Sequence, residues 1–249
     1  MKIVLFSIFG FNVYSHGVFL VLAMLIGGWL TYRFARKSSL DTGRFFLNYL
    51  ISLIVGILLS RLFFYLLNLN DYTSVWQMVQ IWKGGLVSFA GFAAGALIFI
   101  WLLWRQNQQI SPWLDIAGIT FPLAIAIGRI GCVLNGEFGI RTKSVLAIYG
   151  YMPVTAFEIY ICVAIFVLNL YLYNNRKIRQ KLPPGSFFLN FLVLYSFSRL
   201  IIDSWRADTP LSIGINASQF VSLIIFLIPA IIYIIIIVRE KRKSGQNEN

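Results

Sequence analysis

The chain has 249 residues, of which 59% are hydrophobic and only 12% are charged. An ordinary soluble domain carries about a quarter charged residues, so the composition excludes that class. The formal net charge of +12 raises the question of nucleic-acid binding, but no basic face interleaved with aromatic residues is found, which argues against nucleic acid as a partner. The two cysteines, Cys132 and Cys162, lie in apolar runs and form no disulfide framework.

Apolar runs of nearly membrane-spanning length recur along the chain. A helix needs about 20 apolar residues to cross the hydrocarbon core of a bilayer, and a helix satisfies its own backbone groups there. The sequence therefore predicts an all-α integral membrane protein with seven transmembrane helices. The predicted spans are residues 13–32, 45–67, 86–104, 113–134, 154–173, 187–203 and 218–238.

No linker between these spans is long enough to separate domains, so residues 1–249 are predicted to form a single transmembrane domain. The first apolar run lacks the features of a removable signal peptide and is interpreted as a permanent span. Residues 238–249 form a polar cytoplasmic tail, and its stretch REKRKSGQNEN, residues 239–249, is expected to be disordered. The third span is rich in Gly and Ala, which predicts close helix packing; the alternative is that its small residues line a cavity for lipid.

Most Lys and Arg residues lie at alternate turns between the spans, which places them on one side of the membrane. Cytoplasmic loops carry such an excess of cations. The N-terminus is therefore predicted to lie outside, and the C-terminus with its tail in the cytoplasm. The cations of the predicted cytoplasmic side are Arg33, Arg36, Lys37, Arg44, Arg105, Arg176, Lys177, Arg179, Lys181, Arg239, Lys241, Arg242 and Lys243.

Several charged residues fall within the spans or at their ends, where a charge costs several kcal/mol unless it pairs, snorkels or meets water. These residues are Arg61, Asp115, Arg129, Glu158, Arg199 and Asp203. Asp115 is interpreted as a helix-start carboxylate near the positive dipole end of its own helix. Arg199 and Asp203 are four residues apart on one helix face, so a structural ion pair between them is open.

Arg129 is the hardest of these residues to explain by structure alone. It lies between Gly128 and Gly131, whose small size leaves room around a guanidinium, although an ordinary ion pair is also open. A guanidinium matches a phosphate through a two-pronged hydrogen bond and stays charged in apolar surroundings. On the predicted topology, the phosphates at this depth belong to phospholipids of the outer leaflet. The residues therefore predict a phospholipid held at an arginine cluster, beside Asn135 and Glu137, which orient or deprotonate a second reactant.

The stretch GRIGCVLNGEFG, residues 128–139, resembles the signature of the bacterial prolipoprotein diacylglyceryl transferase family. Its matching residues are Gly128, Arg129, Gly131, Asn135, Glu137 and Gly139. Further segments resemble the family in the same order along the chain: YSHGVFLVLAM, IWKGGLVSFAGFAAG, PVTAFEIY, YSFSRLIIDSWRAD and ASQFVS. The resemblance therefore covers nearly the whole chain.

The resemblance implies a seven-span enzyme of the bacterial cytoplasmic (inner) membrane. Such enzymes transfer the diacylglyceryl group of phosphatidylglycerol to the lipobox cysteine of a prolipoprotein signal peptide, which forms a thioether and releases glycerol phosphate. Arginines would stabilise the charge of the departing group, while a base generates the cysteine thiolate, the competent nucleophile. No cofactor and no metal is expected, because the sequence shows no metal-ligand spacing around His16 and this chemistry requires none.

The buried charges and the resemblance together predict three sets of site residues. The residues expected to bind phospholipid are Arg61, Arg129, Arg199, Arg206 and Gly139. The residues expected to act in catalysis are Arg129, Arg206, Glu137, Asn135 and His16. The residues expected to orient these groups are Asp203, Glu158, Gly128, Gly131 and Gln219.

The chain departs from the family pattern on the acceptor side of the expected site. The usual third-span histidine is absent near Ala90, and His16 replaces a tyrosine of the first span. Cys132 stands where the signature has its first Asn, and Thr155 or Ala156 lies where a Gln is usual. These departures leave the phosphate-handling arginines in place and leave the base open.

His16 is one hypothesis for a relocated base, since it is the sole histidine and lies near the predicted outer end of the first span. The alternative is an interfacial histidine in the headgroup region. Glu137 is the rival base, but neighbouring arginines favour its ionised form and make it a weak base, so we expect it to orient the site. Two other functions stay open beside transfer to prolipoproteins: a paralogue with the same donor site and a different acceptor, and a non-catalytic lipid-binding or transport protein.

Overall fold

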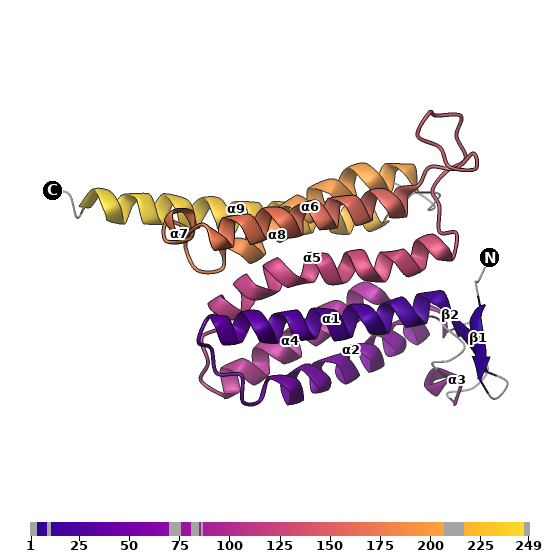
Figure 1. The fold of residues 1–249 in the computed structure, drawn as a ribbon, viewed down its shortest axis with the longest axis horizontal. Helices are drawn as coiled ribbons and strands as arrows, with labels where there is room; N and C mark the ends of the chain where they lie inside the picture. Colours follow the sequence, from indigo (N-terminus) through magenta and orange to yellow (C-terminus); the bar gives the residue numbers. More distant parts are fainter. Residues whose placement is uncertain are drawn as a thin grey trace. The chain divides into compact units, whose positions relative to one another are not determined.

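The computed structural model describes residues 4–8, 11–69, 76–80, 85, 87–206 and 217–246. Seven of its helices are long and apolar enough to cross a membrane, which confirms the predicted all-α membrane fold. They are α1 (Ser15–Lys37), α2 (Phe45–Leu67), α4 (Ser88–Arg105), α5 (Ile110–Leu134), α6 (Val154–Asn174), α8 (Ser186–Ile202) and α9 (Ala217–Gln246) (Figure 1). The predicted spans recur in the same order, and the second has the predicted bounds.

Shorter elements complete the described part of the chain. These are the helices α3 (Trp76–Val79), α7 (Arg176–Arg179) and η3 (Asp203–Trp205), a 3-10 turn that continues α8. Strands β1 (Val4–Ile8) and β2 (Phe11–Tyr14) form an antiparallel hairpin before α1. This hairpin was not predicted from the sequence, because the β-branched and aromatic residues that favour strands also make up apolar spans. As a result α1 begins later than predicted.

The polar tail 238–249 differs from its prediction, because α9 continues through it to Gln246. Arg, Lys, Glu and Gln are good helix formers, so a helix that starts in an apolar span can extend past it without burying further surface. The expectation of disorder is therefore wrong for residues 239–246. Residues 247–249 lie outside the described part of the chain.

The chain divides into two compact units, one of Met1–Thr31 with Ser111–Asn249 and the other of Tyr32–Ile110. In the smaller unit α2 and α4 pack through glycines. A Cβ added to Gly56 would lie 2.9 Å from the carbonyl oxygen of Gly91, and one added to Gly95 would lie 3.1 Å from that of Ser52. The predicted close packing of the third span is therefore confirmed. A single domain for residues 1–249 stays a prediction.

In the larger unit α5 packs against α1 on one side and against α6 and α8 on another (Figure 1). Pro122 lies inside α5 and has no N–H to donate to the carbonyl of Gly118, four residues earlier. Asn169 of α6 supplies the missing donor: its Nδ2 donates to that carbonyl at 2.9 Å and to the carbonyl of Phe187 at 3.3 Å. Freed backbone groups need such partners where water is excluded, so this buried amide joins α5, α6 and α8.

Asp115 has a different role from the one expected. Since α5 begins at Ile110, Asp115 lies beyond the first turn of its own helix. Its carboxylate instead accepts backbone hydrogen bonds from Gly185 at 2.8 Å and from Phe187 at 2.9 Å, where α8 begins. Asp115 therefore caps a neighbouring helix, whose first N–H groups have no partner within the helix.

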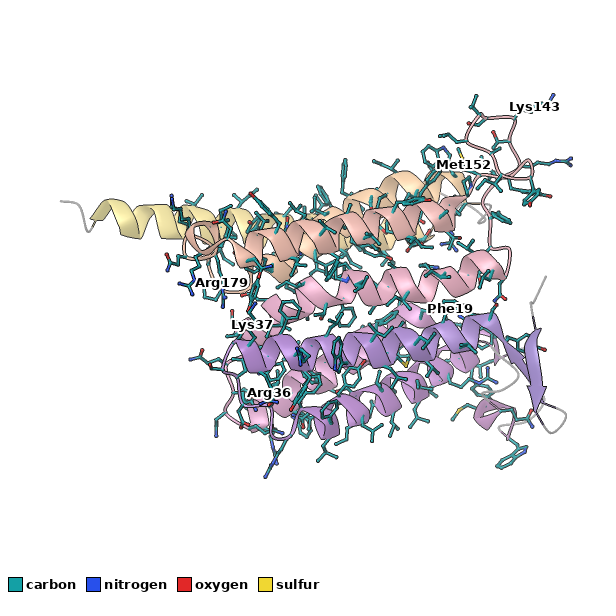
Figure 2. The ribbon with its side chains drawn as sticks, viewed as in Figure 1. Phe19, Arg36, Lys37, Lys143, Met152 and Arg179 are labelled. Atoms are coloured by element: carbon teal, nitrogen blue, oxygen red, sulfur yellow. The ribbon has the colours of Figure 1, made fainter. Side chains whose placement is uncertain are left out.

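The two ends of the larger unit carry cations from different loops. Figure 2 shows Lys143, in the loop between α5 and α6, at the opposite end of this unit from Arg179, which follows α6. This arrangement agrees with the alternation of loops on which the predicted topology rests. Which end faces the cytoplasm stays a prediction.

Candidate active site

The signature residues 128–139 cover the last turns of α5 and the chain reversal that follows. Gly136 has φ +74°, in the left-handed region that favours glycine. Its N–H donates to the carbonyl of Val133 at 3.0 Å, and the N–H of Glu137 donates to the carbonyl of Cys132 at 3.1 Å. These two bonds form a Schellman ending of the helix. The reversal brings Glu137 back beside Cys132.

A chain of ion pairs joins α5, α6 and α8. Arg129 Nε lies 2.9 Å from Oε2 of Glu158, whose Oε1 lies 3.0 Å from Nη1 of Arg199. Arg199 Nη2 lies 2.9 Å from Oδ1 of Asp203, which confirms the helical pair that the spacing suggested. Tyr195 OH also donates to Glu158, at 2.7 Å. Two guanidinium groups and two carboxylates thus balance each other in formal charge, which offsets the cost of burying them.

Arg129 and Arg199 are held differently in this chain of ion pairs. The side chain of Arg199 is 12% exposed, and both of its Nη atoms face carboxylates. The side chain of Arg129 is 25% exposed, and only its Nε faces Glu158. A guanidinium has five N–H donors, so the Nη atoms of Arg129 retain donors for an anion. The guanidinium of Arg129 is therefore held in one orientation by Glu158 while its side chain stays partly exposed.

Beside Arg129 lies a cluster of three residues that carry metal-binding atoms: His16, Cys132 and Glu137. Their ligand atoms all lie within 4.8 Å of one another, and Nδ1 of His16 lies 3.4 Å from Sγ of Cys132. Sγ of Cys132 also lies 3.9 Å from Nη1 of Arg129, so the cluster and the arginine are contiguous. His16 and Cys132, which the sequence analysis considered separately, are here in contact.

Gly131 makes this contact between α1 and α5 feasible. A Cβ at Gly131 would lie 2.9 Å from Cα of His16 and 3.0 Å from Cβ of Phe19; Figure 2 labels Phe19 on α1. Gly128, in contrast, has room for a Cβ, since its nearest neighbour would be Cβ of Ala23 at 3.8 Å. Close helix approach therefore requires Gly131 and does not require Gly128.

Two further hydrogen bonds hold the chain reversal. Oγ of Ser15, a fully buried residue, donates to Oδ1 of Asn135 at 3.0 Å. Thr155 Oγ1 donates to the backbone carbonyl of Glu137. No sequence signal gave a role to Ser15 or Thr155. Tyr195 lies in a segment that resembles the family, four residues before Arg199. Asn135 is thus placed to orient the turn.

Arg61 lies in the other compact unit and has different partners. Its Nε, Nη1 and Nη2 donate to the backbone carbonyls of Met78 at 2.9 Å, Gly85 at 2.8 Å and Gln80 at 3.2 Å. Arg61 is buried, and these bonds fasten the segment after α2 to that helix. No sequence signal marks a carbonyl as a partner, because every residue has one. A phosphate-binding role for Arg61 stays a prediction.

The remaining predicted residues lie around the end of α8. Gly139 donates through its N–H to the carbonyl of Met152 at 2.8 Å, and a Cβ at Gly139 would collide with the carbonyl oxygen of Trp205. Met152, labelled in Figure 2, is buried with Val154 and Ile202. These contacts give Gly139 a packing role, and phospholipid contact at this residue stays a prediction.

Arg206 and Gln219 also lie near the end of α8. The N–H of Arg206 donates to the carbonyl of Asp203 at 3.3 Å. Gln219 Nε2 donates to the carbonyl of Leu200 at 3.5 Å, which links the start of α9 to α8. Arg206 thus follows directly on the chain of ion pairs, and its phosphate role stays a prediction.

Seven apolar helices, with a partly exposed arginine held in a buried network of charges, define a polytopic membrane protein. Residues 3–236 match the model of the prolipoprotein diacylglyceryl transferase family, and the chain belongs to this family of transferases. It is 28% identical over 243 residues to the phosphatidylglycerol–prolipoprotein diacylglyceryl transferase of Thermotoga maritima, across 90% of this chain and 81% of the relative. The enzyme of the same name from Streptococcus pyogenes is 25% identical over 238 residues, across 89% of this chain and 88% of the relative.

Proposed function

We propose that this protein transfers the diacylglyceryl group of phosphatidylglycerol to the lipobox cysteine thiol of prolipoproteins. The reaction takes place at the outer leaflet of the bacterial cytoplasmic membrane, with the N-terminus outside and the C-terminus in the cytoplasm. The observation that carries the proposal is Arg129, whose Nε is fixed by Glu158 while its Nη atoms keep access to an anion. Membership of the family supplies the reaction.

Arg129 binds the phosphate of the donor lipid. A guanidinium donates two parallel hydrogen bonds to phosphate oxygens and stays charged where water is scarce. Its value for catalysis is greatest as negative charge develops on the leaving phosphate, because a fixed donor needs no reorganisation at that moment. Glu158 acts through Arg129 as a positioning residue, since its carboxylate is 3% exposed and already has three partners.

The reaction is a nucleophilic substitution at the glycerol carbon that bears the phosphate oxygen. The acceptor thiolate forms a C–S bond to this carbon, and the C–O bond breaks with its electron pair on the phosphate oxygen. Glycerol phosphate leaves, and the diacylglyceryl group remains on the acceptor as a thioether. The acceptor thiol approaches on the side of His16, Cys132 and Glu137, which adjoins Arg129.

The direct test is incubation of the purified protein with phosphatidylglycerol and a lipobox peptide. The expected result is a peptide mass gain of one diacylglyceryl group, with release of glycerol phosphate in equal amount. A peptide whose lipobox cysteine is replaced by serine should gain nothing, because a hydroxyl is a far weaker nucleophile than a thiolate.

The same assay separates the alternatives. Glycerol phosphate release with no modified peptide would indicate the same donor and a different acceptor. Binding of phosphatidylglycerol without release would indicate a lipid-binding or transport protein. Either result would overturn the proposed reaction.

A further inference from the structure

We infer that His16, Cys132 and Glu137 form a zinc site with one open position, which takes the acceptor thiol as its thiolate. The acceptor part of this inference rests on the proposed function; the metal site itself does not. A zinc ion bound there would act as a Lewis acid in place of a general base.

The donor set has the composition of a zinc site. Zinc in proteins is bound by Cys sulfur, His nitrogen and carboxylate oxygen, and a catalytic site keeps three protein ligands with the fourth position open. For bond lengths of about 2.0 to 2.3 Å, tetrahedral ligand atoms are separated by about 3.3 to 3.8 Å. Nδ1 of His16 and Sγ of Cys132 are 3.4 Å apart. Glu137 is within 4.8 Å of both and, being exposed, can close that distance by side-chain rotation.

Two glycines and a buried hydroxyl bring these ligands close together. Gly131 admits His16 to the surface of α5, and the left-handed Gly136 turns Glu137 back towards Cys132. Ser15 binds the chain reversal through its hydroxyl, directly before His16 in the sequence. The spacing around His16 predicted no metal because Cys132 is 116 positions away in the sequence.

The electrostatics suit a bound thiolate. One zinc ion, one Cys thiolate and one carboxylate sum to zero charge, and a second thiolate makes the site anionic. Arg129 lies 3.9 Å from Sγ of Cys132 and faces this anionic cluster, with the phosphate site on the same guanidinium. Zinc holds a thiol in its deprotonated form near neutral pH, so the proton leaves to solvent before the sulfur attacks. The nucleophile and the departing phosphate then lie next to each other.

The test uses the full-length protein in detergent or nanodiscs, with Zn²⁺ and Co²⁺ as probes. We expect one zinc per chain in the wild type, at least a tenfold loss of affinity in His16→Gln, and loss of the site in Cys132→Ala. The matched control is Cys162→Ala, since Cys162 is the other buried cysteine and lies outside the cluster. The Co²⁺ form should show sulfur-to-metal charge-transfer absorption in the wild type and the control, and none in Cys132→Ala.

The open position is tested on the same Co²⁺ protein. A lipobox peptide should change the ligand-field spectrum, and its serine counterpart should leave the spectrum unchanged. The inference would be overturned if the wild type and Cys132→Ala bound zinc with equal affinity. It would also be overturned if the ligand-field spectrum did not change on addition of the peptide thiol. Full transfer by chelated protein would overturn it too, while leaving the proposed function intact. Thiol-dependent spectra without any diacylglyceryl product would instead contradict the proposed function and support the zinc site.

Discussion

The Nε atom of Arg129 lies 2.9 Å from Oε2 of Glu158, so the guanidinium is fixed to α6, while its side chain stays 25% exposed and its Nη1 lies 3.9 Å from Sγ of Cys132. Replacing Arg129 by Ala removes the donors that face the leaving phosphate. We expect the transfer rate to fall about 100-fold or more, in line with the loss of a preorganised donor. Arg129→Lys should recover only part of this loss, because an ammonium cannot make the forked contact.

The matched control for Arg129 is Arg141→Ala, a cation on the exposed loop after α5. The initial rate of peptide modification measures all three variants. An unchanged rate in Arg129→Ala would contradict its assignment to the phosphate.

Glu158 should matter for stability as well as for rate. Glu158→Gln keeps a polar partner for Tyr195 but removes the charge that balances Arg129 and Arg199. Breaking a buried ion pair on one side costs about 3 kcal/mol or more, so the midpoint of unfolding in detergent should fall clearly. Glu137→Gln, measured on metal-free protein, is the comparison, since that carboxylate is exposed and should leave the midpoint almost unchanged. Equal effects would argue against the network of charges.

The two glycines that flank Arg129 should differ sharply on substitution. A Cβ at Gly131 meets backbone of α1 at 2.9 Å, while one at Gly128 meets only Cβ of Ala23 at an ordinary 3.8 Å. Gly131→Ala should therefore displace His16 and lower both stability and transfer. Gly128→Ala should be neutral or slightly stabilising, because Ala is the better helix former by about 1 kcal/mol. Loss of transfer in Gly128→Ala with unchanged unfolding would show that the guanidinium itself needs that space.

Gly136 tests the chain reversal after α5. At φ +74° a side chain costs about 1 to 2 kcal/mol, and Asn tolerates this conformation better than β-branched residues do. We expect Gly136→Val to lower transfer more than Gly136→Asn, in the order of their cost in the left-handed region. The ratio of the two transfer rates is the measurement, and a larger loss in Gly136→Asn would contradict the role of the turn.

Asp115 should affect folding without affecting chemistry. Asp115→Ala removes both acceptors for the N–H groups of Gly185 and Phe187. Loss of a cap costs about 1 kcal/mol, which should lower the unfolding midpoint. The midpoint of Asp115→Asn should lie between those of the wild type and Asp115→Ala. The rate per folded molecule, measured at a temperature where all variants are folded, should stay the same. A reduced rate there would give Asp115 a part in the site.

The sequence predicted those features of the fold and of the candidate site that depend on local spacing. Arg199 and Asp203 pair as an i,i+4 spacing permits, and the small residues of the third span pack closely against α2. It did not predict that Glu158 would form ion pairs with both Arg129 and Arg199, or that Arg61 would donate hydrogen bonds to backbone carbonyls. Both depend on which helix faces come together, and apolar periodicity alone does not fix the rotation of a helix in a bilayer.

The sequence by itself determined the membrane class, the order of the spans and the presence of charges within them. The hydrocarbon core requires helices whose backbone hydrogen bonds are made within the helix, and a charge there is costly and therefore rare. The contact between His16 and Cys132 was decided by the tertiary structure alone. It requires α1 to approach α5 at Gly131, and a pair separated by 116 positions leaves no periodic trace in the sequence.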